Sequence, residues 1–140
     1  MKHIVTRDKQ RVADWVSDKI GCGKWHSEFE AIGLEQDGAL VAGMVVDGYV
    51  ENTRCSMHVA GEGRRWLNRE FIKVCFGYVF KQLNCKVVLG PVSSANADAL
   101  RFDKHLGFTE AGRVSDGSPD GDLVLLQMTK ADCRWLETAL

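Results

Sequence analysis

The sequence lacks the features that define several classes of protein. None of its hydrophobic runs reaches the roughly 18 uninterrupted apolar residues needed to cross a membrane. It has only two prolines and no low-complexity linker, and its 45% hydrophobic content excludes a disordered tail. The first ten residues, MKHIVTRDKQ, contain no apolar signal core, so we expect a cytoplasmic protein that is not exported. The 140 residues suit one domain, spanning residues 1–140.

The five cysteines form no CxxC pair, and we expect reduced thiols rather than a disulfide set. The spacings Cys22-x3-His26 and Cys55-x2-His58 would supply four zinc ligands. They are looser than the spacings of a zinc ribbon. Each histidine also has another explanation. His26 is suited to packing or surface exposure, and His58 is suited to proton transfer. We therefore expect no metal, and a small zinc domain is retained only as an alternative.

Basic residues show no broad excess, because the net charge is −1, and we expect no nucleic-acid partner. The charge is nevertheless uneven along the chain. Residues 25–51 contain six acidic and no basic side chains, whereas residues 62–86 contain six basic and two acidic ones. This asymmetry is typical of a domain that meets an anion on one side and a cation on the other.

Apolar periodicity predicts seven strands and four helices. The predicted strands are Lys2–Val5, Phe29–Gln36, Leu40–Val46, Tyr49–Val59, Lys86–Gly90, Phe108–Val114 and Leu123–Met128. The predicted helices are Arg7–Ile20, a long helix from near Trp66 to Leu83, Asn96–Leu106, and a short one over Cys133–Leu136. We expect Thr6 to cap the first helix and Gly21 to end it, and Asn96 and Gly107 to do the same for the third.

Two Asp-Gly pairs, Asp37-Gly38 and Asp47-Gly48, separate apolar runs and predict two hairpins in succession. The strand–helix–strand that follows predicts a right-handed parallel crossover. The predicted fold class is therefore α/β (α+β), with a single mixed, mostly antiparallel sheet, a central βαβ crossover and flanking helices. Gly77 lies inside the long helix, where we expect it to let another element approach closely.

The strand Tyr49–Val59 is expected at the centre of the sheet, and its side chains alternate in character. Cys55 and Met57 point to one face, while Ser56 and His58 point to the other. A central strand with one polar face requires a cleft or solvent on that side. A glycine-containing loop, AGEGRRW, then opens onto a basic helix and is suited to bind phosphate through backbone N–H groups.

The segment NADALRFDKHLGF, with its opening asparagine and its Leu-Gly-Phe ending, resembles the motif of the GNAT N-acetyltransferases. The predicted order of elements is similar to that fold over essentially the whole chain. The closing hairpin followed by CRWL resembles the short acetyltransferases encoded by bacteriophages, which would place this protein in a host cytoplasm. The resemblance implies acetyl-CoA and an amine acceptor, a small molecule or a protein, as partners, and leaves a homodimer open.

In that family the fourth and fifth strands separate, and the pantetheine arm of the co-substrate lies between them. The resemblance implies that Met57, Val59 and Ala60 would pair with this arm, which Asn96 would reach unless it holds the start of its helix. The pyrophosphate would rest on the loop residues Gly61, Glu62, Gly63, Arg64, Arg65 and Trp66. This loop only approximates the family's usual pattern.

Asp103 stands where the resemblance places a tyrosine that protonates the leaving thiolate. An aspartate is ionised at neutral pH unless burial raises its pKa. We therefore expect Asp103 to be a solvated helix residue, with water protonating the sulfur. Asp103 is retained as a catalytic candidate only for the case in which burial raises its pKa. Ser94 and Tyr78 are weaker substitutes.

Amide formation requires a neutral amine, and a histidine is suited to remove its proton near pH 7. His58 is the candidate base, Glu51 is a candidate that would act through water, and a backbone N–H near Val59 or Ala60 would hold the oxyanion. The candidate substrate-binding residues are Glu28, Glu30, Arg54 and Ser56. We expect an acetyl-CoA-dependent N-acetyltransferase; the alternative is a non-catalytic module on the same fold that binds acyl-CoA or a host protein.

Overall fold

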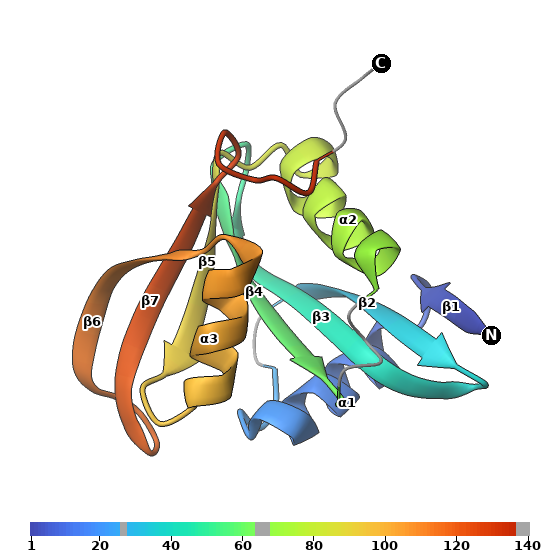
Figure 1. Cartoon of the computed structure of the whole chain (residues 1–140), viewed down its shortest axis with the longest axis horizontal. Helices are drawn as coiled ribbons and strands as arrows, with labels where there is room; N and C mark the ends of the chain where they lie inside the picture. The colour runs from blue at the N-terminus through green and yellow to red at the C-terminus, as the bar shows by residue number, and fades with distance from the viewer. Residues whose placement is uncertain (26–27, 64–67, 137–140) are drawn as a thin grey trace.

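The computed structural model describes residues 1–25, 28–63 and 68–136, and its strands form one sheet (Figure 1). In chain order the elements are β1 (Lys2–Val5), α1 (Lys9–Ile20), β2 (Phe29–Gln36), β3 (Ala39–Val50), β4 (Arg54–Gly61), α2 (Arg69–Gly77), η1 (Tyr78–Gln82), β5 (Val87–Ser93), α3 (Ala97–Leu106), β6 (Thr109–Ser118) and β7 (Gly121–Thr129). The strand order is β1-β2-β3-β4-β5-β7-β6. No helix among these residues is long and apolar enough to span a membrane.

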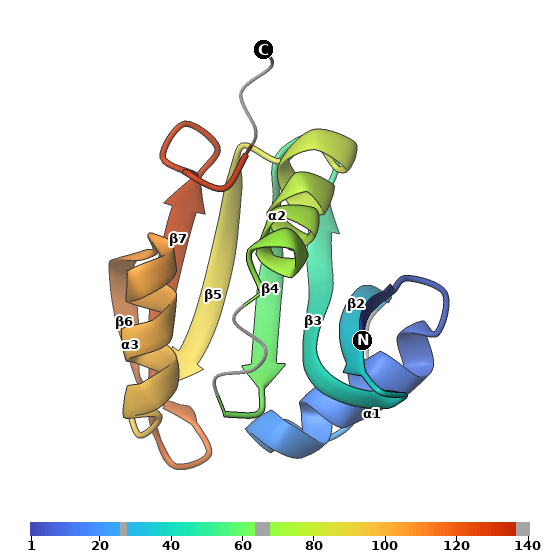
Figure 2. The same cartoon turned by 45° about the vertical axis from the view of Figure 1, so that its right-hand side comes forward.

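The β4–β5 pair is parallel and every other strand pair is antiparallel. This confirms the predicted mixed sheet with one central βαβ crossover. Helix α1 packs against one face of the sheet, while α2 and α3 lie over the other (Figures 1 and 2). The larger core, on the α2 side, includes the fully buried Phe76, Phe80 and Leu126, and the smaller core lies under α1.

Two glycines of the sheet let α1 approach closely. A Cβ atom on Gly43 would lie 2.6 Å from Cγ2 of Val16, and one on Gly33 would lie 2.8 Å from Cγ2 of Val12. Both valines are completely buried. The absence of side chains at these two positions of β2 and β3 therefore sets the depth at which α1 sits, and with it the position of the C-terminal end of α1.

The first Asp-Gly turn forms as predicted, whereas the second does not. Asp37 and Gly38 both have the positive φ of a tight hairpin turn, +54° and +87°. At Asp47-Gly48 the strand β3 continues instead to Val50, and the pairing with β4 shifts between Asp47 and Val50. Gly48 keeps its positive φ of +60° within this bulge, and the chain turns at residues 51–53. A bulge and a turn demand the same backbone conformation from glycine, so the sequence signal was ambiguous.

The predicted long helix is divided and shorter than expected. Regular α-helix covers α2, and a π-helical turn, η1, carries the chain on to Gln82. The expected close approach at Gly77 is wrong, because a Cβ atom built there meets nothing within 4 Å. The part of the prediction near Trp66 lies outside the described residues.

The ends of α3 confirm both predicted caps. The Asn96 side chain accepts a hydrogen bond from the Ala99 N–H (3.1 Å), and Gly107 ends the helix with φ of +121°. By contrast, Asp8 and not Thr6 precedes α1. The predicted helix over Cys133–Leu136 is absent, and these residues form turns. This segment bonds the end of α3: Trp135 Nε1 donates to the carbonyl of Leu106 (2.8 Å).

Candidate functional site

The strands β4 and β5 separate after three residue pairs. Only Arg54, Cys55 and Ser56 of β4 are in register with β5, opposite residues 87–89. From Met57 to Gly61, β4 has register partners on β3 but none among the described residues of β5 (Figure 2). The backbone N–H and C=O groups on this edge of β4 therefore have no strand partner, although such groups require hydrogen bonds.

Pro91 lies in β5 where β4 has departed. Proline has no N–H to donate, and within sheets it occurs at edges or irregular positions. Beyond Leu89, β5 pairs only with β7, so its other side is an edge there. Pro91 is therefore a sequence signal of the strand separation. The predicted strand Lys86–Gly90 ended one residue before it, so the signal was not used.

A cleft in two parts occupies the region where the strands separate. The first part has a volume of about 490 Å³ and contains His58, Pro91 and the tip of the β6–β7 hairpin. The second, of about 890 Å³, is lined by Gly61, Gly63 and one side of α3 from Asp98 to His105. The two parts join, because five lining residues are shared: Ile20, Val59, Asn96, Ala99 and Asp103.

The structure brings together the described residues proposed to bind the co-substrate, except Glu62, which lines neither part of the cleft. Met57, Val59 and Asn96 line the first part of the cleft. The residues Val59, Ala60, Gly61, Gly63 and Asn96 line the second. The remaining candidates, Arg64, Arg65 and Trp66, lie outside the described residues. Asn96 uses its side-chain oxygen to cap α3, which is one of the two roles expected for it.

His58 lines the first part of the cleft and is held firmly. Its Nε2 lies 2.9 Å from Oδ1 of Asp47 on β3, and its side chain is only 15% exposed. The ring of Trp25 packs edge-on against it, with centroids 5.0 Å apart. Sequence reasoning missed both neighbours: the Asp47-Gly48 pattern pointed to a turn, and a tryptophan next to an irregular segment carries no specific signal.

Asp103 lines both parts of the cleft and is half-buried, which corrects the expectation of a solvated residue. Burial raises the pKa of its carboxyl group to about 7. No hydrogen bond or ion pair of this carboxyl group occurs within the described ranges. The condition under which an aspartate can deliver a proton near neutral pH is therefore met.

Two basic side chains line the second part of the cleft, and the sequence did not reveal this placement. Lys19, in the last turn of α1, lines this part together with Gly61 and Gly63. Its Nζ lies 2.6 Å from Oε1 of Glu62, inside the glycine loop. Arg101 of α3 also lines it and forms an exposed ion pair (3.4 Å) with Asp98, which lines the same part. A lysine near a helix C-terminus is common in sequences, and only tertiary packing places this one beside the loop.

Three other catalytic candidates do not reach the cleft. Glu51 is exposed in the β3–β4 turn, at the far end of β4 from the cleft, because the chain turns there and not at Asp47. Four strand residues, about 13 Å at the usual rise, separate the start of β4 from His58. Ser94 and Tyr78 line neither part of the cleft.

None of the four candidate substrate-binding residues lines the cleft. Glu30 forms an exposed ion pair with Lys9 (3.3 Å), and Glu28 is exposed near it in the chain. Arg54 is exposed at the start of β4, and Ser56 lies beside the parallel pairing with β5. Residues from the end of α1 and from the β6–β7 hairpin line the first part of the cleft instead, and these were not predicted.

The alternative zinc site does not form from the residues proposed for it. Cys55 is buried in the core on the α2 side, whereas His58 packs against Trp25 on the α1 side. Side chains an odd number of residues apart on a strand point to opposite faces. The fourth candidate, His26, lies outside the described residues, and within the described ranges no group of three or more metal-binding side chains gathers.

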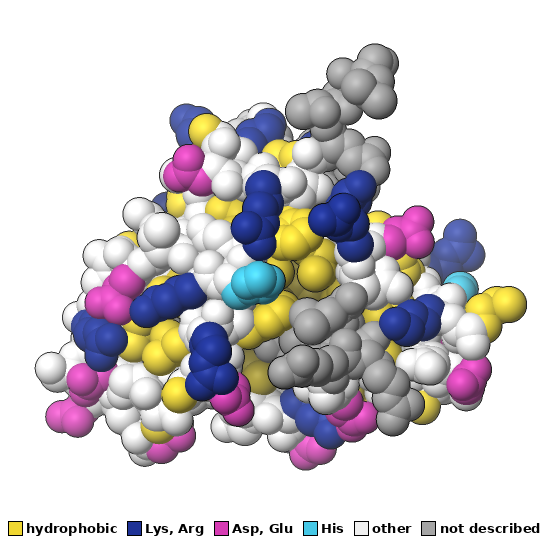
Figure 3. Space-filling model, viewed as in Figure 1, with side chains coloured by type: hydrophobic (Ala, Val, Ile, Leu, Met, Phe, Trp, Pro, Cys, Tyr) yellow, Lys and Arg dark blue, Asp and Glu magenta, His cyan; other side chains and the backbone are white. Residues whose placement is uncertain are grey.

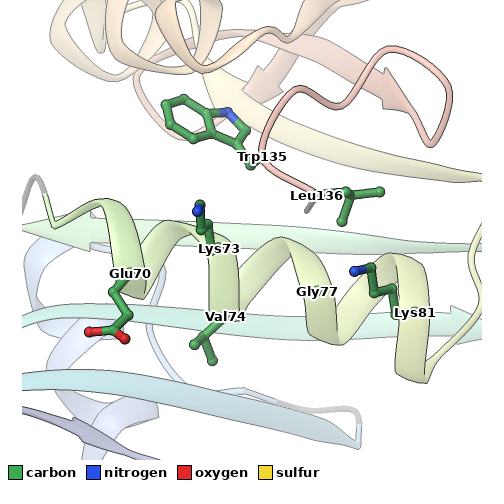
Figure 4. A pocket seen from close by; sticks show the side chains of 7 residues that line it. All are labelled: Glu70, Lys73, Val74, Gly77, Lys81, Trp135 and Leu136. Carbon is green, nitrogen blue, oxygen red and sulfur yellow. The ribbon is translucent and has the colours of Figure 1, made fainter. Parts of the chain in front are cut away.

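A separate, smaller hollow of about 260 Å³ lies between α2 and the C-terminal segment. Lys73 of α2 and Lys81 of η1 line it from one side, and Trp135 and Leu136 line it from the other (Figure 4). In the space-filling view, the surface between α3 and α2 is hollowed and hydrophobic, with Lys and Arg side chains at its rim (Figure 3).

No protein-family model matches the sequence, and no curated protein sequence does. Solved acetyltransferase structures do resemble it. A mutant form of the spermidine/spermine N-acetyltransferase SpeG from Vibrio cholerae is 12% identical, with a TM-score of 0.71 over 94% of this chain and 96% of that one. The putative acetyltransferase YncA from Salmonella typhimurium, solved with acetyl-CoA, is 15% identical, with a TM-score of 0.69 over 91% and 93%. The chain therefore has the GNAT acetyltransferase fold.

Proposed function

We propose that this protein is an acetyl-CoA-dependent N-acetyltransferase in which a primary amine attacks the acetyl group directly within a ternary complex. The observation that carries the proposal is the separation of β4 from β5, which leaves strand backbone free to pair with an extended arm that contains amides. The shared fold supports it, since SpeG and YncA are named as acetyltransferases and YncA was solved with acetyl-CoA.

The two parts of the cleft suit the two ends of such a co-substrate. The edge of β4 from Met57 to Ala60 would pair with the pantetheine arm. The phosphates would lie at the second part, where Gly61 and Gly63 offer backbone close to Lys19. Arg64, Arg65 and Trp66 remain proposed phosphate contacts from the sequence. The Lys19 ammonium also offsets the charge of Glu62, which would otherwise repel an anion.

The acetyl-CoA, when bound, supplies an acetyl thioester. His58 would accept a proton from the acceptor ammonium, so that the amine nitrogen regains its lone pair. Backbone N–H groups near Val59 or Ala60 would donate to the oxygen on which charge develops. Asp103, protonated below its raised pKa of about 7, would donate its proton to the departing sulfur, and the nitrogen of the adduct would release its second proton to the Asp103 carboxylate so formed or to water. Holding both reactants in one cleft supplies much of the rate, and no covalent intermediate with the protein is needed.

The acceptor side favours a cationic amine. Among the described residues that line the first part of the cleft, two are aspartates, Asp103 and Asp120, and none is a lysine or arginine. A positively charged acceptor therefore meets no like charge there. The name of SpeG as a spermidine/spermine N-acetyltransferase supports the inclusion of spermidine in an acceptor panel, alongside peptides with a free amine.

The test of the proposal is calorimetric titration with CoA, using two variants of one helix. Ala99 lines both parts of the cleft, so Ala99→Phe should fill it and abolish CoA binding. Ala97 is exposed on the same helix and lines neither part, so Ala97→Phe should bind CoA as the wild type does. Equal affinity for CoA in all three proteins would refute the proposal that CoA binds in this cleft. Turnover of acetyl-CoA across the amine panel then separates an enzyme from a non-catalytic binding module.

A further inference from the structure

Two neighbouring strands bring a carboxylate and an imidazole together beneath the surface. Asp47 on β3 and His58 on β4 are only 21% and 15% exposed, and Oδ1 of the first lies 2.9 Å from Nε2 of the second. Trp25 holds the other side of the imidazole ring. The indole N–H of Trp25 donates to the carbonyl of Ala13 in α1 (2.9 Å), which anchors this contact to the helix. The ring is therefore fixed from two sides.

Asp47 owes its position to the irregularity in β3. The β3–β4 pairing is regular up to Asp47, which lies opposite Ser56, and it shifts immediately afterwards. The positive φ of Gly48 accommodates this shift. Had the chain turned at Asp47-Gly48, as the sequence suggested, Asp47 would be an exposed turn residue. The bulge instead leaves it on the ladder, diagonally across from His58.

Only one member of the pair lines the cleft. His58 does so, whereas Asp47 lines neither part, and any effect of Asp47 on a bound substrate must pass through the histidine. An ionised carboxylate can only accept hydrogen bonds, so a hydrogen bond of this kind requires the ring proton to be on Nε2. The lone pair of the neutral ring is then on Nδ1.

We propose that Asp47 is a positioning residue that fixes the orientation and tautomer of His58 for proton transfer from the acceptor amine. This inference rests on the proposed function. In the step, an N–H bond of the ammonium breaks and its electron pair stays on the amine nitrogen. The proton forms a bond with Nδ1 of His58. The resulting imidazolium keeps its Nε2–H bond to Asp47, which remains ionised throughout.

The first test needs no substrate. In protein labelled with ¹⁵N-histidine, the nitrogen chemical shifts of the neutral imidazole distinguish the two tautomers, and His58→Gln identifies the signals of residue 58. We expect Nε2 to be protonated and Nδ1 to be bare. A neutral ring protonated on Nδ1 would overturn the proposal, because Nε2 would then be unable to donate to Asp47.

The second test is a double-mutant cycle in the acetylation assay, with spermidine and a lysine-containing peptide as acceptors. Asp47→Asn should lower kcat at least about 10-fold, with the KM for acetyl-CoA unchanged. In a His58→Ala background the same substitution should change kcat less than about 2-fold, because residues that act as a unit are not additive. If Asp47→Asn lowers kcat by the same factor in both backgrounds, Asp47 does not act through His58.

Asp37→Asn is the matched control, since Asp37 precedes a glycine in the other Asp-Gly pair and its exposed carboxylate forms an ion pair with the Met1 ammonium, away from the cleft. Its kcat should equal that of the wild type. If His58→Ala retains full kcat, the assignment of the base fails, and the positioning role fails with it. If CoA does not bind the wild type, the proposed function itself fails. The calorimetric and kinetic results therefore distinguish the two failures.

Discussion

His58 on β4 and Asp103 on α3 line the same part of one cleft, although 45 residues separate them in the sequence. His58 is hydrogen-bonded to the carboxylate of Asp47 and packed against the indole of Trp25. Burial raises the pKa of the Asp103 carboxyl group to about 7. One group is thus suited to accept a proton and the other to donate one, in a space where both can reach a substrate.

The first prediction concerns the proton donor. Asp103→Asn should lower kcat about 10-fold at pH 6.5, because Asn cannot supply the proton. In the wild type the carboxyl group loses its proton as the pH rises through about 7, so the difference between the two proteins should shrink toward pH 9. The measurement is kcat from pH 6 to 9 with the best acceptor of the panel. The exposed Asp132, replaced by Asn, is the control; a ratio independent of pH would argue against an acid role.

The second prediction concerns the stability cost of burying this carboxyl group. Its pKa is about 7 in the folded state and near 3.8 when unfolded, so the folded state binds more protons between these values. The contribution of Asp103 to stability is therefore greatest below about pH 4 and is lost as the pH rises through about 7. Asp103→Asn should raise the melting temperature relative to the wild type at pH 8 but not at pH 4. A constant difference across this range would mean that the carboxyl group is solvated.

The third prediction concerns the basic end of the cleft. Lys19→Met should weaken CoA binding by about 2- to 5-fold at low salt, the range expected for one partly exposed ion pair. The effect should fade as salt is added, and binding of pantetheine, which has no phosphate, should not change. Lys24→Met is the control, because Lys24 is exposed and lines neither part of the cleft. A loss of pantetheine affinity equal to the loss of CoA affinity would remove Lys19 from phosphate binding.

The fourth prediction concerns the packing of α1 on the sheet. Gly43→Ala would place a methyl group 2.6 Å from a buried Val16 methyl, so we expect it to lower the free energy of unfolding by about 1–3 kcal/mol. Gly77→Ala is the matched control, since its methyl group meets nothing and alanine favours a helix by up to about 1 kcal/mol. Urea denaturation measures both. If Gly43→Ala is as stable as the wild type, α1 does not sit at the depth described.

Several ends of elements that one residue decides were predicted correctly, although the Thr6 cap of the first helix was not. Asn96 caps α3, Gly21 and Gly107 end their helices, and Asp37-Gly38 forms its turn, because each depends only on backbone conformations within a few residues. The second Asp-Gly pair failed because glycine with positive φ serves a bulge as well as a turn. Pairing with β4 over the preceding residues favoured continuation of the strand.

The candidate site was predicted in part. The edge of β4 from Met57 to Gly61 was singled out in advance, because a polar face on a central strand and a glycine loop are visible in the sequence; its use for the co-substrate remains what the resemblance implies. Other residues that line the first part of the cleft were not predicted. Asp120 and the end of α1 reach the cleft through the folding of distant segments, and no local pattern marks them.

The sequence by itself determined the order of strands and helices, the class of the sheet and the strand that carries His58, because periodicity and caps act over short distances along the chain. Only the tertiary structure decided where β4 leaves β5, that Asp47 contacts His58, and that Asp103 is shielded from water. These properties depend on groups that are far apart in the sequence. The pKa of a carboxyl group and the partner of an imidazole follow from what folding places around them.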